Sequence, residues 1–127
     1  MSRIKICGLR RPEDIAAVNE ARPDYCGFIV EYPKSRRSID RTTLRELVRG
    51  LREKIVPVGV FVNATKELVA ELLEEGTIQI AQLHGQESQE YIQELKVLTE
   101  KPLIQAFSIK SKEDVERARE SVADYIL

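Results

Sequence analysis

The sequence predicts an α/β protein with parallel strands, and three observations support this fold class. Short apolar runs rich in β-branched residues recur along the chain at intervals of about 25 residues. These runs are apolar throughout, which is typical of strands buried on both faces of a parallel sheet. Segments with helical periodicity separate them, so the repeating unit is a strand followed by a helix. The predicted strands are residues 4–7, 25–30, 55–62, 78–83, 103–107 and 125–127.

The segments between these strands carry apolar stripes at helical spacing and residues that favour a helix start. Pro12 suits the first helical position, where no N–H is needed, and Asp40 and Thr65 are expected N-caps. Gly76 is expected to end the third helix, and Ser111 forms an S-x-x-D cap with Asp114. The expected core-facing residues are Ile15 and Val18, then Leu44, Leu47, Val48 and Leu51, then Leu68, Val69, Leu72 and Leu73, then Tyr91, Ile92, Leu95 and Leu98, and finally Val115, Ala118 and Val122.

Two architectures share this order of elements: a five-stranded doubly wound sheet and the first part of a (β/α)8 barrel. The pattern alone does not choose between them. At about 25 residues per unit, 127 residues hold five units and the beginning of a sixth. The last residues, 123–127, lie inside an apolar strand, which favours the barrel. Because no Gly/Ser/Pro-rich linker interrupts the chain, we expect residues 1–127 to be a single domain, the N-terminal part of a barrel truncated in its sixth strand.

Composition excludes several classes of function. The formal net charge is -1 and the sequence pI is about 5.9, whereas a nucleic-acid-binding domain is normally strongly basic. The basic stretch at residues 34–54 is expected to be a solvated outer face of a helix. The apolar runs are far shorter than the roughly 20 residues that span a bilayer, and no secretory signal is visible. We therefore expect no nucleic acid and no membrane as partners, and a cytoplasmic location.

Polar residues stand where the predicted strands end, and function collects at this edge in both architectures. A thiol at the turn formed by Cys7 could become reactive, although a buried cysteine often serves as a small apolar residue. An arginine fork at Arg37 suits a carboxylate or phosphate, although loop arginines are often merely solvated. His84 could contact substrate or simply hold a loop. The full set is Cys7, Ser35, Arg36, Arg37, Asn63, Gln82, His84 and Ser108.

Cofactor and metal motifs are missing from the sequence. Two cysteines and one histidine provide no metal-ligand spacing, and no Gly-rich dinucleotide or Walker motif occurs. We therefore expect neither a metal nor a cofactor.

Several short motifs occur in a fixed order along the chain. They are KICGL from Lys5, PED from Pro12, GFI from Gly27, SRR from Ser35, VGVFVN from Val58, QLHG from Gln82 and DYIL from Asp124. Together these segments strongly resemble the phosphoribosylanthranilate isomerases of tryptophan biosynthesis. The resemblance runs from end to end, and its combination of motifs is specific although each motif alone is weak.

This resemblance implies a (β/α)8 barrel and an Amadori rearrangement of N-(5-phosphoribosyl)anthranilate to 1-(2-carboxyphenylamino)-1-deoxyribulose 5-phosphate, without cofactor or metal. It implies that Cys7 is the general base and that Arg37 binds the anthranilate carboxylate, while Gln82 and His84 line the substrate pocket. The family's general acid is an aspartate that follows a segment like Tyr125–Leu127 at the end of strand six. That aspartate and the phosphate-binding loops of strands seven and eight lie outside these 127 residues.

Three hypotheses follow from the sequence. The first is the N-terminal portion of such an isomerase, whose 127 residues alone we expect to be inactive. The second is a non-catalytic five-unit module or half-barrel, completed by another chain or a second copy, because an open barrel leaves two edge strands unpaired. The third, a different sugar-phosphate barrel enzyme, is disfavoured by the ordered motifs.

Overall fold

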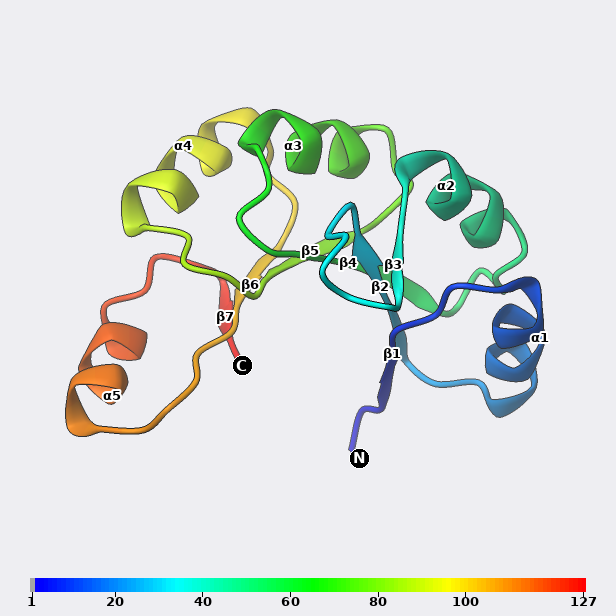
Figure 1. The fold of residues 1–127 in the computed structure, drawn as a ribbon, viewed down its shortest axis with the longest axis horizontal. Coiled ribbons are helices and arrows are strands. Elements are labelled where there is room, and N and C mark those ends of the chain that lie inside the picture. Colours follow the sequence, from blue (N-terminus) through cyan, green and yellow to red (C-terminus); the bar gives the residue numbers. More distant parts are fainter. Residues whose placement is uncertain (1) are drawn as a thin grey trace.

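The computed structural model describes residues 2–127, in which one curved parallel sheet carries helices on its convex side (Figure 1). The helices form an outer arc, and the two termini lie on the open side of that arc. The strands are β1 (Lys5–Cys7), β2 (Tyr25–Val30), β3 (Ser38–Ile39), β4 (Val56–Phe61), β5 (Ile80–Leu83), β6 (Leu103–Gln105) and β7 (Tyr125–Ile126). The helices are α1 (Pro12–Ala21), α2 (Arg41–Arg49), α3 (Lys66–Glu74), α4 (Gln89–Leu98) and α5 (Lys112–Arg119).

The strand order decides between the two predicted architectures. The order is β1-β2-β4-β5-β6-β7, with every neighbouring pair parallel, and β3 pairs with the end of β2. A doubly wound sheet reverses its order at a switch point and carries helices on both faces. Sequential order with all helices outside is the arrangement of a (β/α)8 barrel. The predicted fold class, a partial barrel, is confirmed.

The register of the strands separates an outer face from an inner face. Side chains alternate between faces along each strand, and directly opposite partners share a face. Phe28 pairs with Gly59 on the outer face, and Ile29, Val60 and Gln82 form a row on the inner face. The outer face meets the helices, and its largest side chains are fully buried in the core.

Local signals set most helix ends as predicted. Pro12 is the first residue of α1, and the side chain of Asp40 accepts a 2.8 Å hydrogen bond from the N–H of Thr43 at the start of α2. Thr65 caps α3 in the same way, at 3.3 Å from the N–H of Leu68. Gly76 follows α3 with a φ of +83°, a left-handed conformation that favours glycine.

The structure differs from the sequence prediction in one short strand and in the packing of two residues. The two-residue strand β3 was missed, because so short a run has no readable period. Leu98 and Val115 were expected in the core but are 44% and 37% exposed, because no described element covers the end of α4 or the outside of α5. The basic side chains of Arg41 and Arg45 lie on the outer side of α2 and remain partly exposed, and they also form ion pairs with the neighbouring elements.

No helix within residues 2–127 is long and apolar enough to cross a membrane. The assignment of residues 1–127 to a single domain stays a prediction.

Candidate active site

The thiol at the carboxyl end of β1 lies beside a glycine of the neighbouring strand. Cys7 is the last residue of β1, its side chain is exposed, and it pairs with Gly27 of β2. A Cβ atom on Gly27 would lie 2.7 Å from the Cys7 Sγ and 3.2 Å from the Lys5 Cε. The missing side chain of Gly27 therefore makes the room in which the thiol and the lysine stem lie.

The loop after β2 places a guanidinium over the loop after β1. A Cβ atom on Gly8 would lie 2.7 Å from the Arg37 Cδ and 2.9 Å from its Nη1, so only glycine lets Arg37 approach. Gly8 also has a φ of +85°, which other residues rarely adopt. The Nη1 of Arg10 donates to the carbonyl of Arg36 at 3.1 Å and ties the two loops together. Arg37 therefore lies beside the strand end that carries Cys7.

The other two predicted site residues lie together on and just beyond β5. Gln82 is 3% exposed on the inner face, and its Nε2 lies 3.3 Å from the Nδ1 of His84. The side chain of His84 is exposed. The Nζ of Lys5 donates to the Oε1 of Gln82 at 2.5 Å. Of the predicted residues, Gln82 and His84 are in direct contact, whereas Arg37 lies over Gly8, the residue next to Cys7, and Lys5 runs from the Cys7 side to Gln82.

The two cysteines differ in environment. Cys26 lies on the outer face at 0% exposure, and burial, with a smaller contribution from the neighbouring Cys7, raises its pKa to about 12. Its thiol therefore stays protonated and out of reach of solvent. Cys7 is the accessible thiol, and the ammonium-bearing side chain of Lys5 passes beside it.

Sequence reasoning missed two residues that shape this edge, Lys5 and Glu87. The Glu87 carboxylate is 8% exposed and accepts N–H bonds from Asn63 at 2.8 Å and from Gly85 at 2.9 Å. It therefore ties the end of β4 to the loop that carries His84. The sequence signal for Glu87 was weak, because a glutamate two residues after a glycine occurs in many loops. Lys5 stood inside a recognised motif, but no local pattern indicated its distant partner.

A cleft of about 980 Å³ opens at this same edge. Its walls come from the segments that follow β4, β5 and β6, and they include His84 and the predicted residues Asn63 and Ser108. The wall formed by the β6–α5 connection and α5 carries charges of both signs, since Arg117 there is paired with Asp114, and Lys110 and Glu120 lie on the same wall. Cys7 and Arg37 lie outside this wall, on the β1–β2 side. His84 is therefore the predicted binding residue that faces the cleft.

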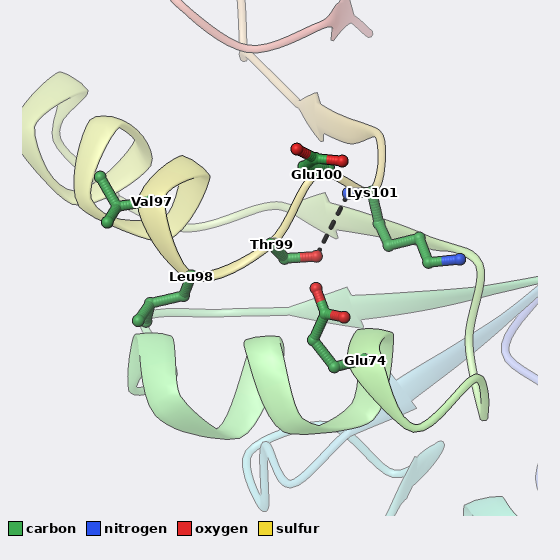
Figure 2. Close-up of a pocket in the computed structure, with 6 residues that line it drawn as sticks. All are labelled: Glu74, Val97, Leu98, Thr99, Glu100 and Lys101. Carbon is green, nitrogen blue, oxygen red and sulfur yellow. Dashed lines mark hydrogen bonds between the residues drawn. The ribbon is translucent and has the colours of Figure 1, made fainter.

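A smaller hollow of about 250 Å³ lies at the amino ends of the strands (Figure 2). It lies between Glu74 of α3 and the connection from α4 to β6, where the Oγ1 of Thr99 accepts the N–H of Lys101 at 3.2 Å. None of the predicted site residues lines it. In the part of the chain that the structure describes, no group of three or more His, Cys, Asp or Glu side chains is placed to hold a metal ion.

Comparison with known proteins agrees with these motifs and this geometry. The family model described as N-(5'-phosphoribosyl)anthranilate isomerase matches residues 4–127. The chain belongs to this isomerase family. A curated member from Acetivibrio thermocellus is 42% identical over all of this chain and 60% of its own length. A member from Caldanaerobacter subterraneus is 41% identical with the same coverage.

Solved structures of the isomerase family share the fold. The enzyme from Thermus thermophilus has a TM-score of 0.80 and 35% identity, over 98% of this chain and 60% of that one. A family structure in complex with reduced 1-(o-carboxyphenylamino)-1-deoxyribulose 5-phosphate has a TM-score of 0.82 and 34% identity, over 93% of this chain and 59% of that one. The chain thus spans about 60% of the length of these relatives.

Proposed function

We propose that this chain provides the base and the carboxylate-binding residue of an N-(5'-phosphoribosyl)anthranilate isomerase. Membership of the family supports the reaction class. The observation that carries the proposal is the position of Arg37 over Gly8, the residue directly after Cys7. An arginine fork binds a carboxylate through two parallel hydrogen bonds, so it can hold an anthranilate group next to a thiol.

The proposed reaction has two proton-transfer stages that need catalytic residues, followed by a tautomerisation. In the first, a general acid protonates the ribose ring oxygen, the bond from C1 to that oxygen breaks, and a Schiff base forms. In the second, the Cys7 thiolate removes the proton from C2, and the electron pair moves through C1 to the nitrogen, giving an enolamine. The enolamine then takes a proton at C1 and loses one from its hydroxyl, giving the ketone.

The chain's residues divide these tasks. Cys7 takes the C2 proton, Arg37 orients the carboxylate, and Gln82 and His84 bind substrate. Lys5 contributes positive charge near a sulfur that must be negative to act as a base. The acid in this proposal is an aspartate beyond Leu127, and loops after strands seven and eight hold the phosphate. The proposal includes a reducing, cytoplasmic location, which keeps Cys7 a free thiol.

Exchanging each cysteine separately tests the proposal in the protein that the complete reading frame encodes. Cys7→Ala is expected to lower kcat by about 10²–10⁴-fold, the usual effect of losing a general base. Cys26→Ala is the matched control, because its thiol lies on the other face of the sheet, and it should leave kcat within a few-fold of the starting enzyme. Turnover of N-(5'-phosphoribosyl)anthranilate by Cys7→Ala at the unchanged rate would overturn the assignment of the base.

A second candidate function is a half-barrel that a partner chain completes, and the exposed edge of the sheet favours it. The side chains of Tyr125, Ile126 and Leu127 are 60%, 51% and 63% exposed along β7, and Ile4 before β1 is 59% exposed. Light scattering of the 127-residue chain is the test, together with the binding of a dye that reports apolar surface. A dimer that binds no dye supports completion by a second copy, whereas a monomer without dye binding contradicts it.

A further inference from the structure

Lys5 crosses the inner face of the sheet to reach a strand that is not its neighbour. Its stem passes Gly27 of β2, and its Nζ donates to the Oε1 of Gln82 on β5 at 2.5 Å. Gln82 is 3% exposed, and among the described residues no buried side-chain nitrogen or oxygen lacks a hydrogen-bond partner. The hydrogen bond from Lys5 therefore satisfies the side-chain oxygen of the buried Gln82 amide, and the nitrogen of the same amide faces His84.

The chemistry of these three side chains permits a single arrangement of protons. A lysine ammonium has three donors and no acceptor, so the amide oxygen of Gln82 must face Lys5. The amide nitrogen of Gln82, which only donates, then faces the Nδ1 of His84 at 3.3 Å. Nδ1 must accept, so the proton of a neutral imidazole lies on Nε2. The choice is made by the lysine, 79 positions before the histidine in the printed sequence.

The backbone around His84 is held independently of its ring. The N–H of His84 donates to the carbonyl of Phe61 at 2.8 Å, and Glu87 accepts the N–H of Gly85 at 2.9 Å. The ring itself has Gln82 as its hydrogen-bond partner in the protein. Its remaining nitrogen, Nε2, belongs to a residue that lines the 980 Å³ cleft.

We propose that Lys5 is a positioning residue that acts through Gln82 to fix His84 as a neutral imidazole protonated on Nε2. His84 then presents an N–H donor to an acceptor oxygen of the ligand in the cleft, and it takes no proton from that ligand. The tautomer follows from this chain's own contacts, whereas the identity of the ligand rests on the proposed isomerase function. The assignment leaves base chemistry to Cys7.

Nitrogen NMR of the imidazole reads the tautomer directly. His84 is the sole histidine of the 127-residue chain, so ¹⁵N-histidine labelling gives a signal from one ring. The unmodified chain is expected to show a protonated Nε2 and a lone pair on Nδ1. Lys5→Met should give a mixture of tautomers, because the freed amide can turn, and Lys5→Arg, which also only donates, should restore the original form. Lys66→Met removes a partly exposed lysine that pairs with Glu94 on the outer helices, and it should leave the tautomer unchanged.

Gln82→Glu is the sharper variant. Its carboxylate accepts at both oxygens, so it can keep the bond from Lys5 but demands a donor at Nδ1. The proton is therefore expected to appear on Nδ1. A starting chain with its proton on Nδ1, or one whose tautomer is unchanged in both Lys5→Met and Gln82→Glu, would overturn the inference.

Kinetics of the complete enzyme separate this inference from the proposed function. Lys5→Met should raise KM for N-(5'-phosphoribosyl)anthranilate by the reciprocal of the fraction of His84 that keeps its proton on Nε2, about twofold for an even mixture of tautomers, and Lys5→Arg should recover the original KM. If the complete enzyme shows no turnover of this substrate, the proposed function fails while the NMR result still decides the tautomer. Unchanged KM in Lys5→Met together with the expected tautomer change would overturn the role of His84 as donor to the ligand.

Discussion

The outer and inner faces of the sheet are built from alternating residues of the same strands, yet the outer face packs against the helices and the inner face carries the candidate site. On β2, Phe28 faces the helices and is fully buried, while its neighbour Gly27 faces inward beneath the Cys7 thiol. On β5, Leu83 is buried in the core and Gln82 carries a hydrogen-bond relay. Stability comes mainly from apolar burial, most of which the outer face supplies, so polar residues can collect on the inner face beside a few buried valines such as Val58. Changes on the two faces should therefore separate stability from activity.

The two thiols should show the largest contrast. Exposed Cys7 is expected to react with iodoacetamide at least about a thousandfold faster than Cys26, which must wait for the strand to open. Peptide mass mapping over time measures both rates in one sample. In strong denaturant the two rates should converge, and similar rates in buffer would contradict the separation of the faces.

Truncating a core aromatic should cause the next largest effect. Phe28→Ala removes a fully buried ring from the outer face and should lower the free energy of unfolding by about 3–5 kcal/mol. Urea unfolding followed by circular dichroism measures the change. Cys7→Ala, on the inner face, is the control and should stay within about 0.5 kcal/mol. Equal losses in the two variants would show that the inner face also stabilises the fold.

Adding one methyl group to either face should give effects of intermediate size, on stability for the outer face and on turnover for the inner face. A Cβ on Gly59 would lie 2.7 Å from the Ile78 Cδ1 within the packed core, so Gly59→Ala should cost about 1–3 kcal/mol of stability. Gly27→Ala meets the thiol of Cys7 and the flexible end of Lys5, both of which can move. It should cost less stability but, under the proposed function, lower turnover of N-(5'-phosphoribosyl)anthranilate by the protein that the complete reading frame encodes. The reverse pattern, in paired urea and activity measurements, would contradict this division.

The ion pairs on the outer helices should give the smallest effect, and one that depends on pH. Hydrogen bonds from Arg45 and Arg41 are the main causes that lower the pKa of Glu75 and of Glu31, respectively. A carboxyl whose pKa is lowered by folding adds stability above its usual range and loses it as pH falls through the folded pKa. Arg45→Gln should therefore be slightly less stable near neutral pH and equal to the starting chain in acid. Thermal unfolding at several pH values and salt concentrations measures the difference, which high salt should also remove. A difference that persists in acid would assign another role to Arg45.

Features set by residues close together in the sequence were predicted correctly, whereas features that depend on residues far apart in the sequence were not. The cap between Asp40 and Thr43 spans three positions, so the sequence could predict it. Val115 was placed wrongly because periodicity marks an apolar stripe but says nothing of whether a neighbour covers it. For the site, the family motifs pointed to Cys7 and Arg37, whose catalytic and binding roles stay predictions. No local pattern could reveal the contact of Lys5 with Gln82.

By itself, the sequence determined the α/β class, the succession of strands and helices along the chain, most helix ends and the family resemblance. Each of these rests on side-chain period, on caps a few residues apart, or on motifs in a fixed order. Only the tertiary structure decided the order of the strands across the sheet, the position of Arg37 over Gly8 and the reach of Lys5 to β5. The physical reason is that such contacts depend on which strands become neighbours and in what register, and both follow from the packing of the whole sheet.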